Sequence, residues 1–466
     1  MPTIKTAIIA LAGLLSLLLL LGAAWFGPGA VALPPIIVSA ACNITYTGRQ
    51  PKDLVLQYDF NGMGDDYSWL ELRFDDERQA VSLDLFGNEI AASFYKRGYG
   101  CAADTAARRA LPEHRFADVV TVPTLVDVSS QFPQLNALIK DEFASDGEGL
   151  GTVVNHRAAL VLHQGRIVAE HYVAPYSEET RFQSQSMAKT INALLWAAAD
   201  MQGLAIMDNP VQAPEWPKDD PRQAITNRDL LNMSSGLDFE ENYETSVTTQ
   251  YFKMLSSGDL GGFAARLELA YEPGMRWYYS GADSNLAARS LRAALDENNL
   301  TVSGFAEQAL FSKIGARDIE LVTDDSGTFW AASFVFASAR NWARIGQLIL
   351  DRGMVEGEPV VPADFIDALA TPLPSSNGQY RHSFWLNRGL EFGEERAHAP
   401  GLPEDTLSLS GYGGQKVHVI PSGDMVIVRL GRAEGPEGYK GYRSFISKVY
   451  AAAMQDLEAE ITAAGL

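Results

Sequence analysis

The sequence predicts an α+β fold in which an antiparallel sheet is flanked by terminal helices, with a mostly helical subdomain between the two ends of the sheet. Two pairs of strand-like runs, near residues 160 and 420, lie far apart in the chain. A helix-like segment precedes the first pair and another follows the second, which is typical of helices covering one sheet. We place this main domain at residues 130–463, after an N-terminal segment at 1–32 and a small β-rich unit at 42–115.

The N-terminal segment has the pattern of a membrane-spanning or export sequence. Residues 7–26 carry no charge and are apolar apart from Ser16, and about 20 such residues span a bilayer. Lys5 and the α-amino group precede them, which is a weak positive-inside signal. We expect this segment either to anchor the chain in a bacterial inner membrane, with the rest in the periplasm, or to be cleaved near Ala32, where an Ala-Val-Ala sequence ends.

The composition limits the classes of partner. The chain has 466 residues, of which 47% are hydrophobic, and a net charge of −21, so it can form a large core and a smaller domain. It has no block of Lys or Arg, which argues against nucleic acid and anionic membrane surfaces as partners. Its seven histidines are scattered, and no Cys/His spacing is typical of a metal site. We therefore expect no metal and no cofactor.

The two cysteines, Cys42 and Cys101, enclose the β-rich unit. Beyond an export segment they would meet an oxidising compartment, where we expect them to form a disulfide that stabilises the fold by about 4 kcal/mol. The runs at 69–74, 81–85 and 90–95 alternate apolar and polar residues, which predicts antiparallel strands with one buried face. This unit carries no recognisable catalytic motif.

The main domain begins and ends with helix and hairpin patterns. Apolar residues at one face of 135–143 predict a helix, and the runs at 158–163 and 166–172 predict a hairpin around Gln-Gly. The runs at 415–420 and 425–430 predict a second hairpin around Pro-Ser-Gly-Asp, and 442–461 is a long amphipathic pattern. These elements form the predicted sheet and its flanking helices.

A possible nucleophile lies at the start of the next helix pattern, which runs from Ser186 to about Gly203. Lys189 is three residues after Ser186, so on a helix the two side chains share a face. A lysine in an apolar environment can lose its proton and act as the base that activates a serine hydroxyl. The same Ser-x-x-Lys pattern at Ser93 lies in a predicted strand, where the two residues point to opposite faces, and we interpret it as a coincidence.

Four segments in order resemble the serine hydrolases related to class C β-lactamases. They are SMAK at 186–189, TNRDLLNMSSGL at 226–237, PGMRWYYS at 273–280 and GYGGQ at 411–415. The similarity covers roughly residues 150–435 and is greatest to the branch that contains 6-aminohexanoate-dimer hydrolases, esterases and penicillin-binding-protein-like members. It implies a β-lactamase/transpeptidase-like fold. Cys42 and the Gly-Tyr-Gly-Cys sequence ending at Cys101 also resemble the N-terminal region of members of that branch.

The resemblance implies roles for three side chains. Ser186 would be the nucleophile, Lys189 the adjacent base, and Tyr279 the phenol that moves protons between nucleophile and leaving group. A phenol with a pKa of about 10 in water needs a cationic neighbour to act near neutrality, and Lys189 would supply it. Without the resemblance, Tyr279 would be interpreted as an aromatic core residue.

The fourth segment occupies the position of the family's Lys-Thr-Gly or His-x-Gly sequence on a strand that lines the cleft. Small residues at Gly413 and Gly414 would let a substrate approach, and the backbone N–H groups of Gln415 and Ser186 would form the oxyanion hole. The alternative is a glycine-rich turn before a strand. Tyr412 replaces a cationic or imidazole side chain, which makes recognition of a substrate carboxylate doubtful.

Gly281 is a second departure, because the family's third motif often runs Tyr-x-Asn and that Asn contacts the acylamide of a β-lactam. Asp283 or Asn285 could stand in its place. Glu240, Glu241 and Tyr243 either border the cleft or form a solvated acidic loop. The loss of the amide favours ester or simple amide hydrolysis over efficient β-lactam hydrolysis.

The sequence therefore predicts a serine hydrolase that acts on a small ester or amide, including peptides or amino-acid oligomers, through an acyl-enzyme. An alternative is a penicillin-recognising or peptidoglycan-binding protein with little turnover, motivated by Gly281 and Tyr412. A third hypothesis, an envelope interaction protein, rests only on the extra β-rich unit.

Overall fold

The computed structural model describes residues 29–55, 70–116, 124–145, 154–242, 245–246, 248–388 and 399–464. The predicted membrane segment at 7–26 lies outside these ranges. Within them, no helix has both the length and the apolar content that crossing a bilayer requires. Attachment to a membrane therefore stays a prediction.

The main domain is built on a seven-stranded antiparallel sheet with the order β12-β13-β14-β15-β16-β5-β6. Both predicted hairpins are confirmed, and they meet in the middle of the sheet, where Ile427 of β16 lies opposite Val161 of β5. The two ends of the domain therefore form one layer. The strands are β5 (Val154–His163), β6 (Arg166–Tyr172), β12 (Tyr380–Arg381), β13 (Phe384–Leu386), β14 (Leu407–Gly411), β15 (Gln415–Ile420) and β16 (Met425–Ala433).

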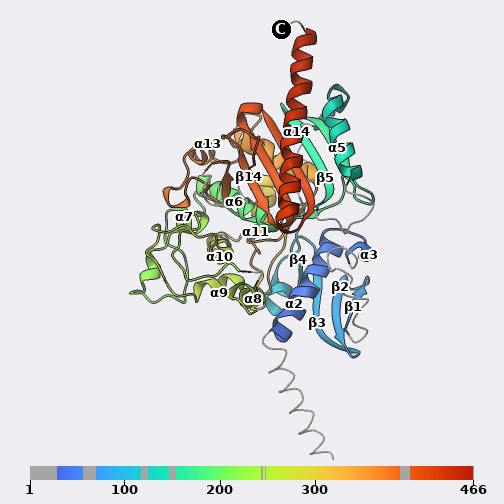
Figure 1. Ribbon diagram of the computed structural model, residues 1–466. Coiled ribbons are helices and arrows are strands. Elements are labelled where there is room, and N and C mark those ends of the chain that lie inside the picture. Colours follow the sequence, from blue (N-terminus) through green and yellow to red (C-terminus); the bar gives the residue numbers. More distant parts are fainter. Residues whose placement is uncertain are drawn as a thin grey trace, which may run out of the picture.

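The predicted flanking helices, α5 (Pro133–Ser145) and α14 (Gly435–Ala464), cover one face of this sheet (Figure 1). Phe143 of α5 and Phe445 of α14 pack together with Ile427 and Val161 in one buried cluster. The helix α14 begins earlier than the predicted 442 and extends past the sheet at its C-terminal end (Figure 1). Terminal helices that share one hydrophobic layer explain why both ends of the domain are needed for the core.

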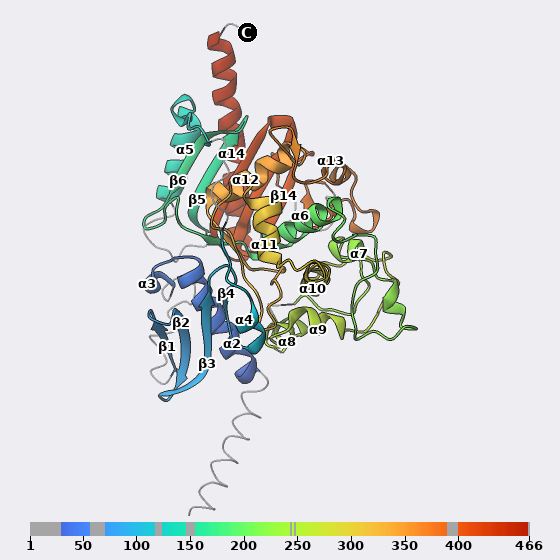
Figure 2. The same ribbon diagram turned by 180° about the vertical axis from the view of Figure 1, so that it is seen from behind.

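The other face of the sheet is covered by α12 (Ala339–Leu350), with α6 (Ala188–Met201) beside it (Figure 2). Gly346 lets α12 lie close to the sheet, since a Cβ there would be 2.5 Å from a methyl carbon of Val426. The predicted helical middle is confirmed as α7 (Asn227–Leu231), α8 (Gln250–Leu255), α9 (Leu260–Ala265), α10 (Gly281–Asp296) and α11 (Val302–Ala306).

A separate three-stranded sheet with the order β7-β9-β8 leads into the candidate nucleophile. Its strands are β7 (Phe182–Gln183), β8 (Glu320–Leu321) and β9 (Val335–Ala337). Ser186 follows β7 by three residues, so this sheet fixes the position of the chain just before the serine.

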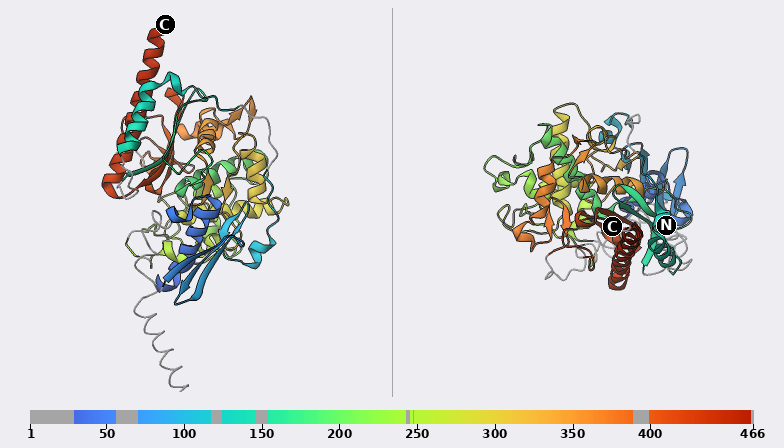
Figure 3. Two further views of the ribbon diagram at one scale, coloured as in Figure 1. Left: turned by 90° about the vertical axis from the view of Figure 1, so that its right-hand side faces the viewer. Right: turned by 90° about the horizontal axis from the view of Figure 1, so that it is seen from above.

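The N-terminal unit contains the predicted antiparallel strands in a four-stranded sheet, β1 (Leu70–Asp75), β2 (Ala80–Leu85), β3 (Asn88–Lys96) and β4 (Gly100–Ala102). The disulfide between Cys42 and Cys101 is formed. The sequence did not predict α2 (Gly29–Cys42), a helix that packs on this sheet. A one-turn π-helix, Asn43–Thr47, continues it. The unit lies against the end of the main domain (Figure 3, left).

Candidate active site

Ser186 lies in a 3₁₀ turn, Gln185–Met187, and the regular helix α6 starts only at Ala188. The predicted helix start at Ser186 is therefore two residues too early. The reason is local, because Gln185 has a left-handed φ of 48° and the Ser184 hydroxyl is bound to β9, accepting from Val335 N at 2.9 Å. A left-handed φ is unfavourable for residues other than glycine, and it is often found in turns at functional sites.

The Lys189 side chain lies within hydrogen-bonding distance of the serine hydroxyl. Its Nζ donates to Ser186 Oγ at 3.3 Å and to the carbonyl oxygen of Ala332 at 2.8 Å. The side chain is 2% exposed, and burial lowers the pKa of Lys189 to about 8, while the charge of Glu241 acts in the opposite direction. A substantial fraction of this amine is neutral just above neutral pH, as a base requires.

Asn285 positions Ala332, whose carbonyl oxygen accepts the hydrogen bond from Lys189. Its Oδ1 accepts from Ala332 N at 3.2 Å, and the side chain is 1% exposed. Asn285 was one of two candidates to replace the family's substrate-binding amide, but its carbonyl group is used within the protein core. Sequence reasoning missed this positioning role because Ala332 is 47 residues away in the chain.

Asp283, the other candidate, is also buried, at 2% exposure. It accepts from Ser235 Oγ at 2.8 Å and from Ser280 Oγ at 3.1 Å. Burial raises the pKa of Asp283 to about 7. The residue therefore ties the second motif to the third and does not line the cleft.

Tyr279 lies beside the lysine, with the Lys189 Nζ 4.8 Å from its ring centroid. The ring stacks on Trp385 with the centroids 5.3 Å apart, and it meets Tyr380 edge-on at 6.1 Å. Both interpretations of Tyr279 therefore describe part of its environment, because the ring packs against aromatic neighbours and also contacts the Lys189 amine.

Glu241 occupies the space that Gly281 leaves open. A Glu241 carboxylate oxygen accepts from Gly281 N at 2.6 Å. A Cβ at residue 281 would lie 3.0 and 3.2 Å from the two carboxylate oxygens. Burial raises the pKa of Glu241, and the nearby Lys189 opposes this change. Glu241 thus borders the cleft, whereas Glu240 is exposed and Tyr243 lies outside the described residues.

The Tyr412–Gly414 segment is a turn between β14 and β15 and not a strand. Gly413 and Gly414 have φ values of 70° and 79°, which disfavour a strand. The turn still lies beside the nucleophile, because a Cβ at Gly411 would be 2.4 Å from the carbonyl oxygen of Ser184. Tyr412 and Gly413 line the cleft, while a Cβ at Gly414 would meet the Arg429 guanidinium at 2.8 Å.

Arg429 and Gln415 hold this turn in place. The Arg429 guanidinium, fully buried, donates to the carbonyl oxygens of Gly413 at 3.1 Å and Gly414 at 3.0 Å. The Gln415 side chain bonds in both directions with the backbone of Gly431. The side-chain amide of Gln415 is therefore used within the sheet, which leaves its backbone as the part that could serve a substrate.

The second Ser-x-x-Lys sequence lies on strand β3, as predicted. The Lys96 Nζ donates to the carbonyl oxygens of Arg108 at 2.8 Å and Leu111 at 2.7 Å. It closes the N-terminal unit on itself, and the buried Ser93 hydroxyl has no hydrogen-bond partner among the described residues.

Ser186 opens into a cleft of about 430 Å³, a size typical of small-molecule sites. Its polar lining includes Ser186, Glu241 and Gln415, and much of the rest is apolar. Sequence reasoning missed one wall, which comes from the helix α2 and the turn after it; the wall residues are Ile36, Ala40 and Ile44. Their spacing of four could have indicated a common helical face, had a helix been predicted there. In the described part of the chain, no group of three or more His, Cys, Asp or Glu could hold a metal ion.

The chain is similar to several known proteins. The chain is 23% identical over 306 residues to a 6-aminohexanoate-dimer hydrolase of Paenarthrobacter ureafaciens, covering 60% of this chain and 73% of that protein. Among solved structures, it is similar to a penicillin-binding protein homologue of Caulobacter crescentus, with a TM-score of 0.51, 16% identity, and coverage of 72% of this chain and 100% of the other. It is also similar to EstCE1, described as a hydrolase with promiscuous acyltransferase activity, with a TM-score of 0.55, 15% identity, and coverage of 70% and 99%.

These structural similarities, at low identity, establish the fold. The family model described as Beta-lactamase matches residues 153–448 of the 466. That range contains Ser186, Lys189, Tyr279 and the turn at 412–414, and it is more than half of the chain. The protein therefore belongs to the beta-lactamase family of hydrolases.

Proposed function

We propose that this protein is a serine hydrolase that cleaves a small ester or amide through an acyl-enzyme on Ser186. The observation that carries the proposal is the buried Lys189 amine, 3.3 Å from Ser186 Oγ and with its pKa lowered to about 8. Peptides and amino-acid oligomers belong to the same substrate class, and the name of the Paenarthrobacter relative supports including them.

Acylation begins when neutral Lys189 removes the proton from Ser186 Oγ, which attacks the carbonyl carbon of the substrate. The carbonyl oxygen becomes an oxyanion, and we assign its stabilisation to the backbone N–H groups of Ser186 and Gln415. The turn held by Arg429 supports this assignment, since it brings the start of β15 next to the nucleophile.

The leaving group departs with a proton that Lys189 and Tyr279 deliver, which leaves the acyl group on Ser186. Water then attacks the acyl carbon and gives a proton to the same pair. The pair passes this proton to Ser186 Oγ as the bond between Oγ and the acyl carbon breaks, which releases the carboxylic acid and the free serine hydroxyl. The contact of Lys189 with the Tyr279 ring supports a shared role, and the stacking on Trp385 fixes the orientation of that ring.

Glu241 distinguishes this site from one that recognises an acylamide. The position of the family's Asn is glycine, and the carboxylate fills the space above it. A carboxylate is an acceptor only, whereas an amide also donates. This exchange favours esters and simple amides over β-lactams as substrates.

We also propose that the enzyme acts outside the bacterial inner membrane, anchored by residues 7–26 or released by cleavage near Ala32. The disulfide between Cys42 and Cys101 supports an oxidising compartment. Fractionation of cells that express the full chain, followed by N-terminal sequencing, separates anchored from cleaved protein, and recovery in the cytoplasm would contradict both.

The first test is intact-mass analysis of the full chain, kept in mild detergent, after exposure to a fluorophosphonate. We expect one adduct, mapped to Ser186, and none in Ser186→Ala. Multiple turnover of an ester would then support a hydrolase, whereas a single stoichiometric burst would favour a penicillin-recognising protein with little turnover. Wild-type hydrolysis by purified, folded Ser186→Ala would show that the nucleophile is misassigned.

A further inference from the structure

The helix α2 has two apolar faces, and only one of them packs within the N-terminal unit. Val38, Ala41 and Cys42 are buried, and Ala41 and Cys42 pack with Val81 and Cys101. The residues on the other side, four apart at Ile36, Ala40 and Ile44, line the cleft that contains Ser186. A helix that served only its own sheet would present polar residues on that second side.

Across the cleft, the α2 face meets apolar residues from the catalytic domain. The helix α8 packs against α2 and contributes Tyr251, Phe252 and Leu255 to the lining, while Trp330 and Phe334 come from the loop that leads to β9. The cleft wall thus combines side chains from both units. Ser186 lines the same cleft.

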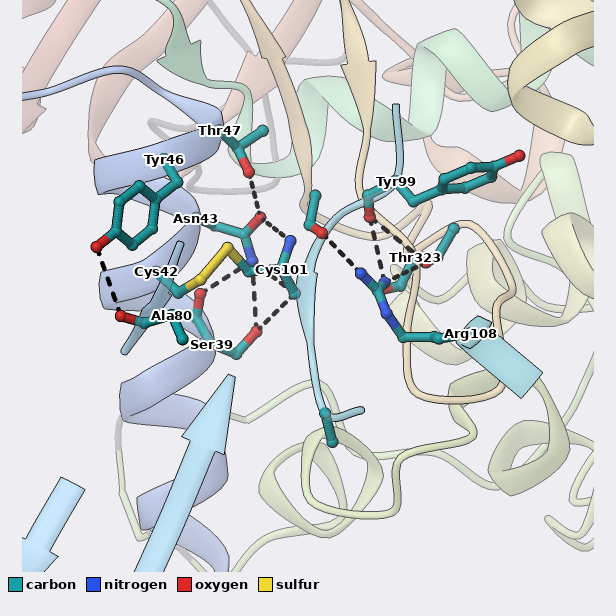
Figure 4. Close-up of a disulfide and its surroundings, with 12 residues drawn as sticks. Ser39, Cys42, Asn43, Tyr46, Thr47, Ala80, Tyr99, Cys101, Arg108 and Thr323 are labelled. Carbon is teal, nitrogen blue, oxygen red and sulfur yellow. Dashed lines mark hydrogen bonds between the residues drawn. A yellow bond between two sulfur atoms is a disulfide. The ribbon is translucent and has the colours of Figure 1, made fainter. Parts of the chain in front are cut away.

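The N-terminal helix is held rigidly in this position (Figure 4). The disulfide joins its last residue, Cys42, to strand β4. The fully buried Asn43 side chain then donates to the carbonyl oxygens of Ser39 and Cys101, each at 2.9 Å, and accepts from Cys101 N and Thr47 Oγ1, each also at 2.9 Å. A helix fixed in this way presents a defined surface and not a mobile cover.

The unit is also bound to the segment that carries the nucleophile. Arg181, just before β7, pairs with Glu320 of β8 at 2.6 Å, and Tyr95 of the N-terminal sheet donates to the same carboxylate at 2.7 Å. On the other side, the Arg108 guanidinium donates to Thr323 Oγ1 at 2.5 Å (Figure 4). These contacts set the distance between the α2 wall and Ser186.

We propose that the α2 face of Ile36, Ala40 and Ile44 is the specificity wall of the enzyme, and that it binds an apolar acyl or alcohol group of the substrate next to the scissile carbonyl. This inference deepens the proposed acyl-enzyme function and rests on it. Substrates with a chain of several methylenes on that side of the carbonyl would gain from the wall, whereas an ester that is short on both sides, such as ethyl acetate, would not reach it. One methylene in a hydrophobic pocket changes kcat/KM by about tenfold or more.

The test compares alkyl fluorophosphonates with an ethyl or an octyl chain as labels of Ser186 in the full chain. We expect Ile36→Ala to slow labelling by the octyl reagent about tenfold and labelling by the ethyl reagent less than twofold. Ala40→Phe, which fills the cleft, should slow the octyl reagent further. Ile37→Ala is the matched control, because Ile37 is adjacent on α2 and does not line the cleft; it should leave both rates unchanged.

Equal effects of Ile36→Ala on both reagents, or equal effects of Ile36→Ala and Ile37→Ala, would overturn the inference. Failure of the wild-type chain to react with either reagent would instead overturn the proposed function. If Ala40→Phe does not fold, judged by its melting temperature, Ile36→Ala still decides the question. Hydrolysis of octyl acetate and ethyl octanoate then tells which side of the scissile bond the wall binds. If the wall binds the alcohol group, Ile36→Ala slows hydrolysis of octyl acetate only; if it binds the acyl group, Ile36→Ala slows hydrolysis of ethyl octanoate only.

Discussion

Replacing Glu241 with Gln removes a charge near Lys189, the proposed base, and keeps the shape of the side chain. The carboxylate accepts from Gly281 N at 2.6 Å, and the oxygen of a Gln side chain can accept the same bond. The variant thus isolates the electrostatic effect of Glu241 on Lys189. Glu240→Gln is the matched control, since Glu240 is the exposed neighbour.

The size of the effect follows from the pKa of Lys189. With a pKa of about 8, roughly 9% of the amine is neutral at pH 7, against about 0.04% for a lysine in water. The Glu241 charge raises the pKa of Lys189, and loss of a nearby opposite charge lowers a lysine pKa by about one unit. The neutral fraction at pH 6 then rises from about 1% to about 9%, which is close to tenfold.

The assay is the rate of fluorophosphonate labelling of Ser186 from pH 5.5 to 9.5. For the wild type we expect the rate to rise with pH and to level off above about pH 8, because protonated lysine cannot accept the serine proton. Glu241→Gln should shift this rise to lower pH and converge with the wild type near pH 9.5, while Glu240→Gln should follow the wild type. An unchanged midpoint in Glu241→Gln, with normal folding, would refute the electrostatic coupling of these two groups.

Three further predictions follow from the same contacts. Gly281→Ala should slow labelling of Ser186 about tenfold, because its Cβ would lie 3.0 Å from a Glu241 carboxylate oxygen. In the Glu241→Ala background, Gly281→Ala should slow labelling only slightly further. Additive losses of labelling rate would contradict the steric explanation. Cys42→Ser should lower the free energy of unfolding by about 4 kcal/mol in urea titrations, an effect that vanishes if Cys101 is already reduced in the wild-type sample. Ser93→Ala should leave the labelling rate unchanged, and a slower rate would mean that the second Ser-x-x-Lys sequence is not a coincidence.

Local sequence patterns predicted most of the main domain. Both hairpins of the central sheet, with turns at 164–165 and 421–424, were recognisable because alternation and turn residues act within a few residues. The start of α6 was misplaced, since the left-handed Gln185 is imposed by the packing of Ser184 on β9. For Tyr412–Gly414 the resemblance implied a strand and the local glycines a turn; the turn is correct. The sequence could not decide between them, because the shape of this segment depends on the buried Arg429.

Two functional features could not be derived from local pattern. Glu241 is one of several acidic residues in its loop, and only Gly281, 40 residues later, shows which of them enters the cleft. The helix α2 contains Pro34 and Pro35, which argue against a helix interior, and its apolar residues follow directly on the predicted export segment. Tertiary contacts outweigh the two prolines, since α2 is stabilised by packing on its sheet and by the disulfide.

The contacts of the N-terminal unit also determine the order in which the protein can assemble during synthesis. Cys42 and Cys101 emerge early and are 59 residues apart, whereas Tyr95 meets Glu320 across 225 residues and Arg108 meets Thr323 across 215. Contacts of such long range form slowly. We therefore expect oxidation to come first and closure of the cleft last, so that the newborn chain exposes Ile36, Ala40 and Ile44 and depends on chaperones until its second half has arrived.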